Sequence, residues 1–167
     1  MSEENIILKN SAIELRPVSD EDLELLMAWR SHPEIYRYFI QQDGPLVWDG
    51  HFHFWKSRRD RIDFIICVKG KPRMRKVGSV NVSCLSGIPE IGVFIGEITL
   101  MGKGIGTKSV RMVLDWLRSH DYKKITAQIS KDNGPSLRLF SNLGFIKCGR
   151  IHNGIVGIYE KILEVKK

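Results

Sequence analysis

The chain has 167 residues, of which 43% are hydrophobic and 27% are charged, which fits one globular domain spanning residues 1–167. No apolar run reaches the roughly 18–20 residues that cross a bilayer. Residues 1–10 lack the apolar core of a secretory signal. We therefore expect no membrane partner and a cytoplasmic location. The three cysteines stand apart in apolar runs, without metal-ligand or disulfide spacing, which predicts buried free thiols and no metal site.

Basic residues outnumber acidic ones and give a formal net charge of +7. Such a balance is typical of proteins that bind nucleic acids, membrane surfaces or anionic small molecules. The cations are scattered along the chain, and neither a long basic helix nor a nucleic-acid module signature is present. We therefore expect no nucleic-acid partner, and a phosphate-bearing cofactor would account for part of the excess.

In the first part of the chain, the sequence pattern predicts one strand followed by helical segments. Asp20, Glu21 and Asp22 are typical of the first turn of a helix, and Pro33 disfavours helix at His32. The expected elements are a strand at 12–16, a helix from about 19 to 32, a short helical stretch at 34–39, a loop at 41–45 and a helix at 47–59.

The remainder predicts strands interrupted by two helices. The expected strands lie at 63–68, 77–85, 90–95, 124–129, 145–151 and 155–163, with helices after Gly106 and within 133–145. Antiparallel hairpins followed by one β-α-β crossover predict a mixed α/β domain of about seven strands and about four helices.

A glycine-dense turn lies between the strand at 90–95 and the following helix. It reads Gly102-Lys103-Gly104-Ile105-Gly106. Glycines let a ligand approach the main chain, and a helix start adds unpaired N–H donors and the positive end of a dipole. This pattern predicts a polyphosphate seat, whereas a helix start that only packs tightly is the alternative. The glycine spacing fits neither a Walker loop nor the dinucleotide fingerprint.

Two motifs around this helix resemble those of the GNAT acyl-CoA N-acetyltransferases. Residues 101–106 are similar to the family's pyrophosphate loop, [QR]-x-x-G-x-[GA], with Met101 in place of Gln or Arg. Residues 133–145 are similar to its later motif, N-x-x-[SA]-x-x-[LF]-[YF]-x-x-x-G-F. The resemblance implies the GNAT fold, in which strands 4 and 5 splay to form the acyl-CoA cleft, with acetyl-CoA as acyl donor.

The resemblance also implies which residues bind the donor. They are the backbone groups of the strand and the turn, together with the start of the later helix. The residues expected at this cofactor site are Val93, Phe94, Ile95, Met101, Gly102, Lys103, Gly104, Ile105, Gly106, Thr107, Asn133, Ser136 and Phe140.

Acetyl transfer to an amine needs a base for the amine proton and a way to stabilise the leaving thiolate. Glu90 is the expected base, because strand alternation places it on the same face as Gly92 and Phe94 and because family members often carry a carboxylate there. An exposed strand-end glutamate is the alternative. Phe140 stands where the family often has a proton-donating Tyr. The hydroxyl groups that remain for that role are Ser136, Ser141 and Tyr159, unless water acts or the thiolate leaves unassisted.

Two aromatic-rich segments resemble the acceptor site of nucleotide-sugar amino N-acetyltransferases of the pseudaminic acid pathway type. The pattern is W-R-x-H-P at 29–33, followed by H-x-x-F at 51–54. The resemblance implies that Arg30 and His51 contact a nucleotide-linked amino sugar through its phosphates and sugar. The aromatic residues expected nearby are Phe54, Tyr38 and Phe39. The alternative is that the tryptophans are core residues and that Arg30 caps its helix or pairs with Glu34.

Two other functions stay open. The opening L-R-P-V-x-D-x-D at 15–22 also resembles enzymes that acetylate protein or ribosomal-protein N-termini. Met101 and Phe140 depart from the family pattern and favour a non-catalytic acyl-CoA-binding regulatory module. The expected partner is a small-molecule amine acceptor, and a homodimer is compatible with the sequence.

Overall fold

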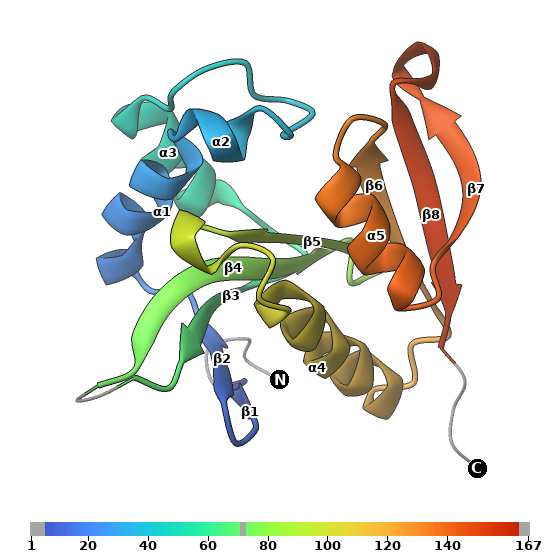
Figure 1. The fold of residues 1–167 in the computed structure, drawn as a ribbon, viewed down its shortest axis with the longest axis horizontal. Helices are drawn as coiled ribbons and strands as arrows, with labels where there is room; N and C mark the ends of the chain where they lie inside the picture. Colours follow the sequence, from blue (N-terminus) through green and yellow to red (C-terminus); the bar gives the residue numbers. More distant parts are fainter. Residues whose placement is uncertain (1–5, 71–72, 164–167) are drawn as a thin grey trace.

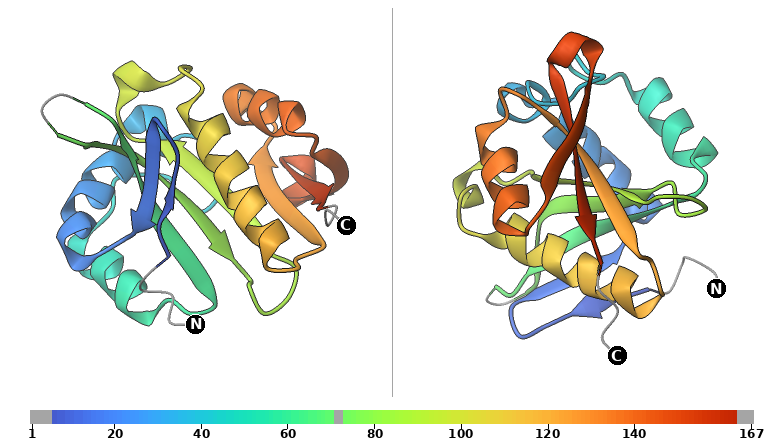
Figure 2. Two further views of the ribbon diagram at one scale, coloured as in Figure 1. Left: turned by 90° about the horizontal axis from the view of Figure 1, so that it is seen from below. Right: turned by 90° about the vertical axis from the view of Figure 1, so that its right-hand side faces the viewer.

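The computed structural model describes residues 6–70 and 73–163. The outer residues of the expected 1–167 domain therefore lie outside the described part. One eight-stranded mixed sheet, in the order β1-β2-β3-β4-β5-β6-β8-β7, forms the centre of the molecule, with helices against both of its faces (Figures 1 and 2). The predicted mixed α/β architecture is confirmed.

The element boundaries follow the predicted order closely. The strands are β1 Leu8–Lys9, β2 Ile13–Pro17, β3 Arg61–Val68, β4 Arg75–Ser83, β5 Glu90–Ile95, β6 Lys124–Ser130, β7 Ile146–Ile151 and β8 Val156–Ile162. The helices are α1 Leu23–Arg30, α2 Pro33–Tyr36, α3 Trp48–Ser57, α4 Ile105–Ser119 and α5 Gly134–Asn142. Among the described residues, short 3-10 turns lie at Asp20–Asp22, Ile98–Leu100 and His152–Gly154. The sequence did not predict β1, a two-residue strand that pairs with β2.

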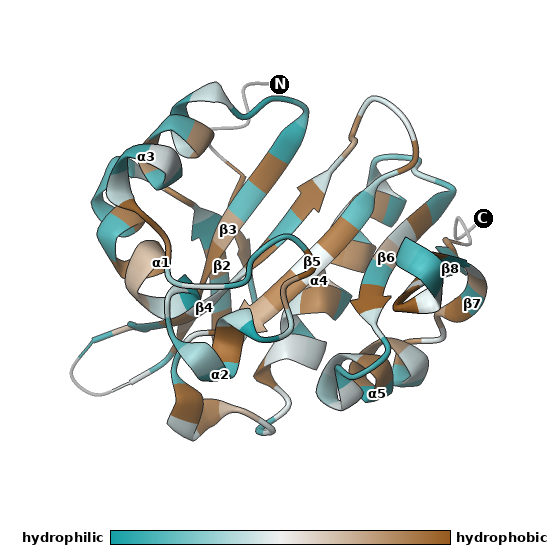
Figure 3. Cartoon of the chain, turned by 90° about the horizontal axis from the view of Figure 1, so that it is seen from above, coloured by the Kyte–Doolittle hydropathy of each residue, from teal (hydrophilic) through white to brown (hydrophobic). Residues whose placement is uncertain are grey.

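Helices cover both faces of the sheet because the central strands are apolar on both sides. Trp29 of α1 and Trp55 of α3 share one cluster with Ile65 of β3. Phe64, the preceding residue of β3, belongs to the other cluster, together with Val113 of α4. Figure 3 shows hydrophobic segments running along β5 through the middle of the molecule.

The start of α1 is tied to the sheet by a buried carboxylate. Asp22 accepts two hydrogen bonds at 2.7 Å from Arg16 of β2 and one at 2.7 Å from Lys76 of β4. Burial opposes ionisation here, but the hydrogen bonds from Arg16 and Lys76 outweigh it and hold the pKa of Asp22 well below its usual range. This anchor ties the start of α1 to β2 and β4.

The sheet opens between β5 and β6. The antiparallel strands β4 and β5 pair from Gly78↔Ile95 to Ser83↔Glu90, whereas the parallel strands β5 and β6 pair at one register, Glu90 opposite Thr126. Beyond Glu90 the two strands diverge (Figure 1). The β5 edge that faces β6 consequently has main-chain groups without a ladder partner, and the splay implied by the resemblance is confirmed.

The prediction for the cysteines was wrong at two of three positions. Cys67 is buried in β3, but Cys84 and Cys148 are exposed. Cys84 lies in the turn after β4 with φ of 58°, and Cys148 lies on β7 at the edge of the sheet, where no element covers it. Within the described residues, no helix is both long and apolar enough to cross a membrane.

Candidate acyl-CoA and acceptor site

A cleft of ≈540 Å³ occupies the gap between the diverging strands and continues under α1 and α3. Its walls come from both halves of the sheet and from the first turns of α5. The predicted site residues that line it are Arg30, Tyr38, Phe39, His51, Phe54, Glu90, Val93, Phe94, Asn133, Ser136 and Phe140. The structure therefore brings Glu90, all five predicted acceptor residues and five of the thirteen predicted donor residues to one cavity, whereas Ile95 and residues 101–107 do not line it.

The glycine turn has the geometry of an anion seat. Gly102 and Gly104 adopt φ of +74° and +76°, which side chains other than glycine rarely tolerate. A Cβ placed on either residue would meet no atom within 4 Å, so the outer side of the turn is open. Across the described residues, the N–H groups of 104–107 have no hydrogen-bond acceptor, as expected for the first turn of α4. This turn fits a pyrophosphate, which would receive those N–H groups and the positive end of the helix dipole.

Two amides of the predicted loop are already used within the protein. The N–H of Met101 donates to the carbonyl of Ile98 at 3.1 Å, and the N–H of Lys103 donates to Leu100 at 3.4 Å. Gly106 is buried, and a Cβ on it would lie 3.1 Å from Cδ1 of Leu139 in α5. Tight packing thus explains Gly106, whereas positive φ angles explain the glycines at 102 and 104.

The start of α5 forms the wall opposite β5. Asn133 caps the helix, because its side-chain oxygen accepts a hydrogen bond from the N–H of Ser136 at 3.1 Å. Phe140 is buried and packs edge-to-face on Phe145, with ring centroids 4.9 Å apart. The phenyl ring at the position of the family's Tyr is therefore a packing residue at the cleft wall.

Glu90 lies at the point where β5 and β6 separate. Its Oε2 accepts a hydrogen bond of 2.7 Å from Nε2 of Gln128 on β6. The neighbouring residue on its face, Gly92, makes room for the side chain of Asn81, since a Cβ there would lie 2.8 Å from Oδ1 of Asn81. A carboxylate in this position can reach a group bound in the cleft.

The three predicted hydroxyl residues do not come together. Ser136 lines the cleft, but Ser141 is exposed near the far end of α5 and does not line it. The ring of Tyr159 lies against Gly157 within β8, on the far side of β6 from β5. Ser141 and Tyr159 therefore lie outside the cleft lining, and their proposed part in thiolate stabilisation stays a prediction.

Arg30 lines the part of the cleft that lies under α1 and α3, and it lies over the ring of Phe39. The Arg30 guanidinium lies 5.2 Å from the ring centroid of Phe39 and donates to the side-chain oxygen of Gln42 at 3.3 Å. Glu34, which was the alternative partner, pairs with Arg37 instead. Burial, and then the like charge of Arg61, lower the pKa of Arg30. Among the described residues, no carboxylate pairs with this guanidinium.

The second guanidinium in the cleft lining is already paired. Arg61 binds the buried carboxylate of Asp63 through two hydrogen bonds of 3.0 and 2.7 Å. Arg58 shares the same carboxylate at 3.2 Å, and Arg61 also lies over the ring of Phe54, 5.3 Å from its centroid. Both oxygens of Asp63 therefore already accept hydrogen bonds. Of the two guanidinium groups that line the cleft, that of Arg30 is the one available to an anionic ligand.

His51 is less accessible than the resemblance implied. It is 4% exposed, and its Nε2 lies 2.9 Å from the carbonyl oxygen of Leu23 in α1. Because a carbonyl only accepts, Nε2 carries a proton, and burial lowers the pKa of the ring and so favours its neutral form. Its other nitrogen, Nδ1, is buried without a partner in the described structure. The ring lines the cleft and, through its hydrogen bond to Leu23, also links α3 to α1.

Sequence reasoning missed several polar residues of the cleft, among them Gln128 of β6, Asn81 of β4 and Arg61 of β3. Each comes from a different strand, and only the pairing register places them beside one another. The alternation of side chains between the two faces of a strand identified Glu90. It does not predict which residue of another strand lies beside it.

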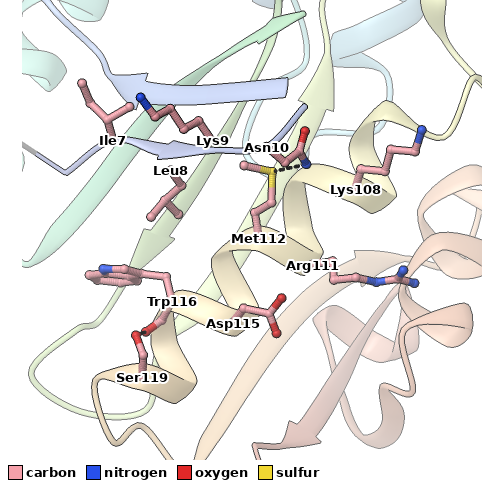
Figure 4. A pocket seen from close by; sticks show the side chains of 10 residues that line it. All are labelled: Ile7, Leu8, Lys9, Asn10, Lys108, Arg111, Met112, Asp115, Trp116 and Ser119. Carbon is pink, nitrogen blue, oxygen red and sulfur yellow. Dashed lines mark hydrogen bonds between the residues drawn. The ribbon is translucent and has the colours of Figure 1, made fainter. Parts of the chain in front are cut away.

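A second, more open depression of ≈780 Å³ lies between β1 and α4 (Figure 4). Asn10 reaches across it to the sulfur of Met112, at 3.3 Å. It is lined by Ile7, Leu8, Lys9, Asn10, Lys108, Arg111, Met112, Asp115, Trp116 and Ser119. None of the predicted site residues belongs to this surface.

The chain is similar to proteins from all three domains of life. It is 51% identical over 140 residues to a protein of Methanocaldococcus jannaschii, and this match covers 83% of the chain but 29% of the relative. It is 25% identical over 160 residues to human alpha/beta-tubulin-N-acetyltransferase 9, covering 85% of the chain and 76% of the relative. The chain thus spans less than a third of the archaeal relative's length.

Solved structures share the fold. A crystallised domain from Methanocaldococcus jannaschii is 48% identical, with a TM-score of 0.88 over 92% of this chain and 100% of that one. An aminoglycoside acetyltransferase in complex with coenzyme A is 18% identical, with a TM-score of 0.76 over 90% of this chain and 94% of that one. Residues 12–146 match the family model of the acetyltransferase (GNAT) domain. With this splayed sheet, this glycine turn and that match over most of its length, the chain belongs to the GNAT acetyltransferases.

Proposed function

We propose that this acetyltransferase uses acetyl-CoA to acetylate the primary amine of a nucleotide-linked amino sugar. The observation that carries the proposal is Arg30. Its guanidinium lines the same cleft as Glu90, has no carboxylate partner among the described residues, and lies on the ring of Phe39. A guanidinium of this kind favours a phosphate, and the flanking rings suit a sugar or a base.

Bound acetyl-CoA supplies the activated acetyl group. Glu90 accepts the proton that the amine loses as its nitrogen bonds to the acetyl carbon and the carbon–sulfur bond breaks. The N–H groups on the open edge of β5 donate to the thioester oxygen as negative charge develops on it. The thiolate of CoA leaves without a dedicated acid, because a thiol with a pKa of about 8.5 is a good leaving group near neutral pH.

A protein N-terminal amine is the second candidate acceptor. It is favoured by the similarity to human alpha/beta-tubulin-N-acetyltransferase 9 over 85% of the chain. A peptide has no phosphate for Arg30, so the two candidates differ in their dependence on this residue.

The test is an acceptor screen in which CoA release from acetyl-CoA is measured by chromatography. Thiol reagents are avoided, because the exposed Cys84 and Cys148 would also react. The probes are UDP-linked sugars with the amine at different ring carbons, the matching sugars without nucleotide, Met-initiated peptides and spermidine. We expect release with at least one UDP-linked amino sugar, and little with the same sugar lacking its nucleotide.

Two results would overturn the proposal. Turnover with the peptides alone would make the chain a protein N-terminal acetyltransferase. Thermal stabilisation by CoA without acceptor-dependent release from any probe would instead indicate a non-catalytic acyl-CoA-binding module.

A further inference from the structure

The carboxylate of Glu90 is held from the opposite side of the splay. Its backbone belongs to the β4–β5 half of the sheet, where it pairs with Ser83. Its Oε2 accepts a hydrogen bond of 2.7 Å from Nε2 of Gln128, whose backbone belongs to the other half and pairs with Ile158 of β8. One side-chain hydrogen bond thus spans the two halves of the sheet at the mouth of the cleft.

The register explains why this contact is made by side chains. Glu90 lies opposite Thr126, the last position at which β5 and β6 pair. The N–H of Thr126 and its hydroxyl both donate to the carbonyl of Pro89, at 2.8 and 3.2 Å. Gln128 is two residues further along β6, on the same face as Thr126, where the strands have already separated and its longer side chain bridges the gap.

The bond leaves one oxygen of the carboxylate available. Within the described residues, Oε1 of Glu90 has no hydrogen-bond partner, while Oε2 is occupied by Gln128. A partly exposed glutamate without such a contact would sample several rotamers. With Oε2 bonded to Gln128 on a paired strand, fewer rotamers are open to the carboxylate, and Oε1 stays free to accept a further hydrogen bond.

We propose that Gln128 is a positioning residue, which orients Glu90 so that Oε1 receives the amine proton. The inference rests on the proposed function of Glu90 as base. Because a correctly oriented base contributes roughly 10²–10⁴-fold to such a reaction, loss of its orientation should reduce kcat by about tenfold. The acetyl-CoA KM should be unchanged, since Gln128 lies apart from the glycine turn.

The kinetic test is a double-mutant cycle with Gln128→Leu and Glu90→Ala, using the UDP-linked amino sugar found in the acceptor screen. We expect Gln128→Leu to lower kcat in the wild-type background and to have no further effect beside Glu90→Ala. Lys124→Gln is the control, because it removes an exposed pair with Glu160 from the same strand. An equal loss of kcat in both backgrounds would mean that Gln128 acts on the fold, and would overturn the proposal.

A second measurement does not depend on turnover. The side-chain amide of Gln128, assigned in NMR spectra by its absence in Gln128→Leu, should exchange its protons slowly and should exchange faster in Glu90→Ala. Slow exchange in an inactive enzyme would leave the positioning contact intact and count against the proposed function alone. Fast exchange in the wild-type protein would overturn the inference about Gln128 even if the enzyme acetylates its acceptor.

Discussion

The indole of Trp29 in α1 lies directly against Gly96, the residue that follows β5. A Cβ on Gly96 would overlap the indole ring, and Trp29 also packs edge-to-face on Phe94, with centroids 6.4 Å apart. This contact packs α1 against the end of β5, the strand that lines the cleft. The backbone at Gly96 has an ordinary conformation, so the glycine is required by the indole and not by its φ angle.

Replacing Gly96 with Ala should therefore destabilise the protein. The indole is 7% exposed and enclosed by its cluster, so the added methyl should cost about 1–3 kcal/mol of unfolding free energy, as overpacked cores do. The measurement is urea unfolding followed by circular dichroism. Gly50→Ala is the matched control, since a Cβ there meets nothing within 4 Å and α3 should gain about 0.5–1 kcal/mol. Equal stability of Gly96→Ala and wild type would show that the helix can shift.

Replacing Gly104 should weaken the binding of CoA. Its φ of +76° costs a side chain such as Val about 1–2 kcal/mol, and the side chain would project over the open turn. We expect the CoA dissociation constant of Gly104→Val, measured by isothermal titration calorimetry, to rise by more than about tenfold, which is 1.4 kcal/mol. Gly44→Ala, at a glycine with open space and no positive φ, should bind CoA as wild type does. Unchanged affinity in Gly104→Val would place the pyrophosphate elsewhere.

Replacing Arg30 should separate acceptor binding from donor binding. Arg30→Gln removes the guanidinium proposed to bind the acceptor phosphate, and a charge-assisted hydrogen bond contributes about 1.5–3 kcal/mol. The KM for the UDP-linked amino sugar should rise by roughly 10–100-fold, with the acetyl-CoA KM unchanged. Arg37→Gln, which removes an exposed arginine paired with Glu34, is the control. A similar loss with both variants, or loss of acetyl-CoA binding, would contradict this role.

His51 should make stability depend on pH in a predictable direction. Burial lowers its pKa in the folded protein below the usual 6.5, so as pH falls through that value the unfolded chain binds a proton that the folded chain does not. Unfolding free energy should therefore decrease between pH 7.5 and pH 5, by at most about 1.4 kcal/mol per pH unit from this group.

The comparison is between wild type, His51→Gln and His53→Gln in urea unfolding at several pH values. His51→Gln keeps a donor for the Leu23 carbonyl and should flatten the decrease, whereas His53→Gln removes an exposed histidine of the same helix and serves as control. An unchanged slope in His51→Gln would show that the ring binds its proton with the same pKa in the folded and unfolded states.

Local patterns predicted most of the fold. The strand at 90–95 was predicted with its observed bounds, because its apolar run is bordered by Pro89 and by the glycine turn. The capping role of Asn133 and the glycines of the turn also follow from short-range backbone geometry. β1 was missed because two residues carry no periodicity, and its pairing depends on the hydrogen bond from Asn10 to Ile13.

The acceptor part of the site was less accessible to sequence reasoning. Arg30 was identified from a motif, but its freedom from carboxylates depends on Arg61 and Arg58 sharing Asp63. Tyr159 lies outside the cleft lining, and a sequence does not reveal that β8 lies beyond β6 in the sheet. Distances between residues on different strands depend on strand order and register. Short-range sequence patterns predict neither of these.

The single rung between β5 and β6 has a mechanical consequence. Five strands lie on one side of this seam and three on the other, and the seam itself adds one register of pairing. Few main-chain hydrogen bonds join the two sets of strands, so amide exchange along the seam should be faster than within either set. A donor molecule bound between the strands would hydrogen-bond to their free main-chain groups. Amide exchange along the seam should therefore be slowest in the enzyme with acetyl-CoA bound.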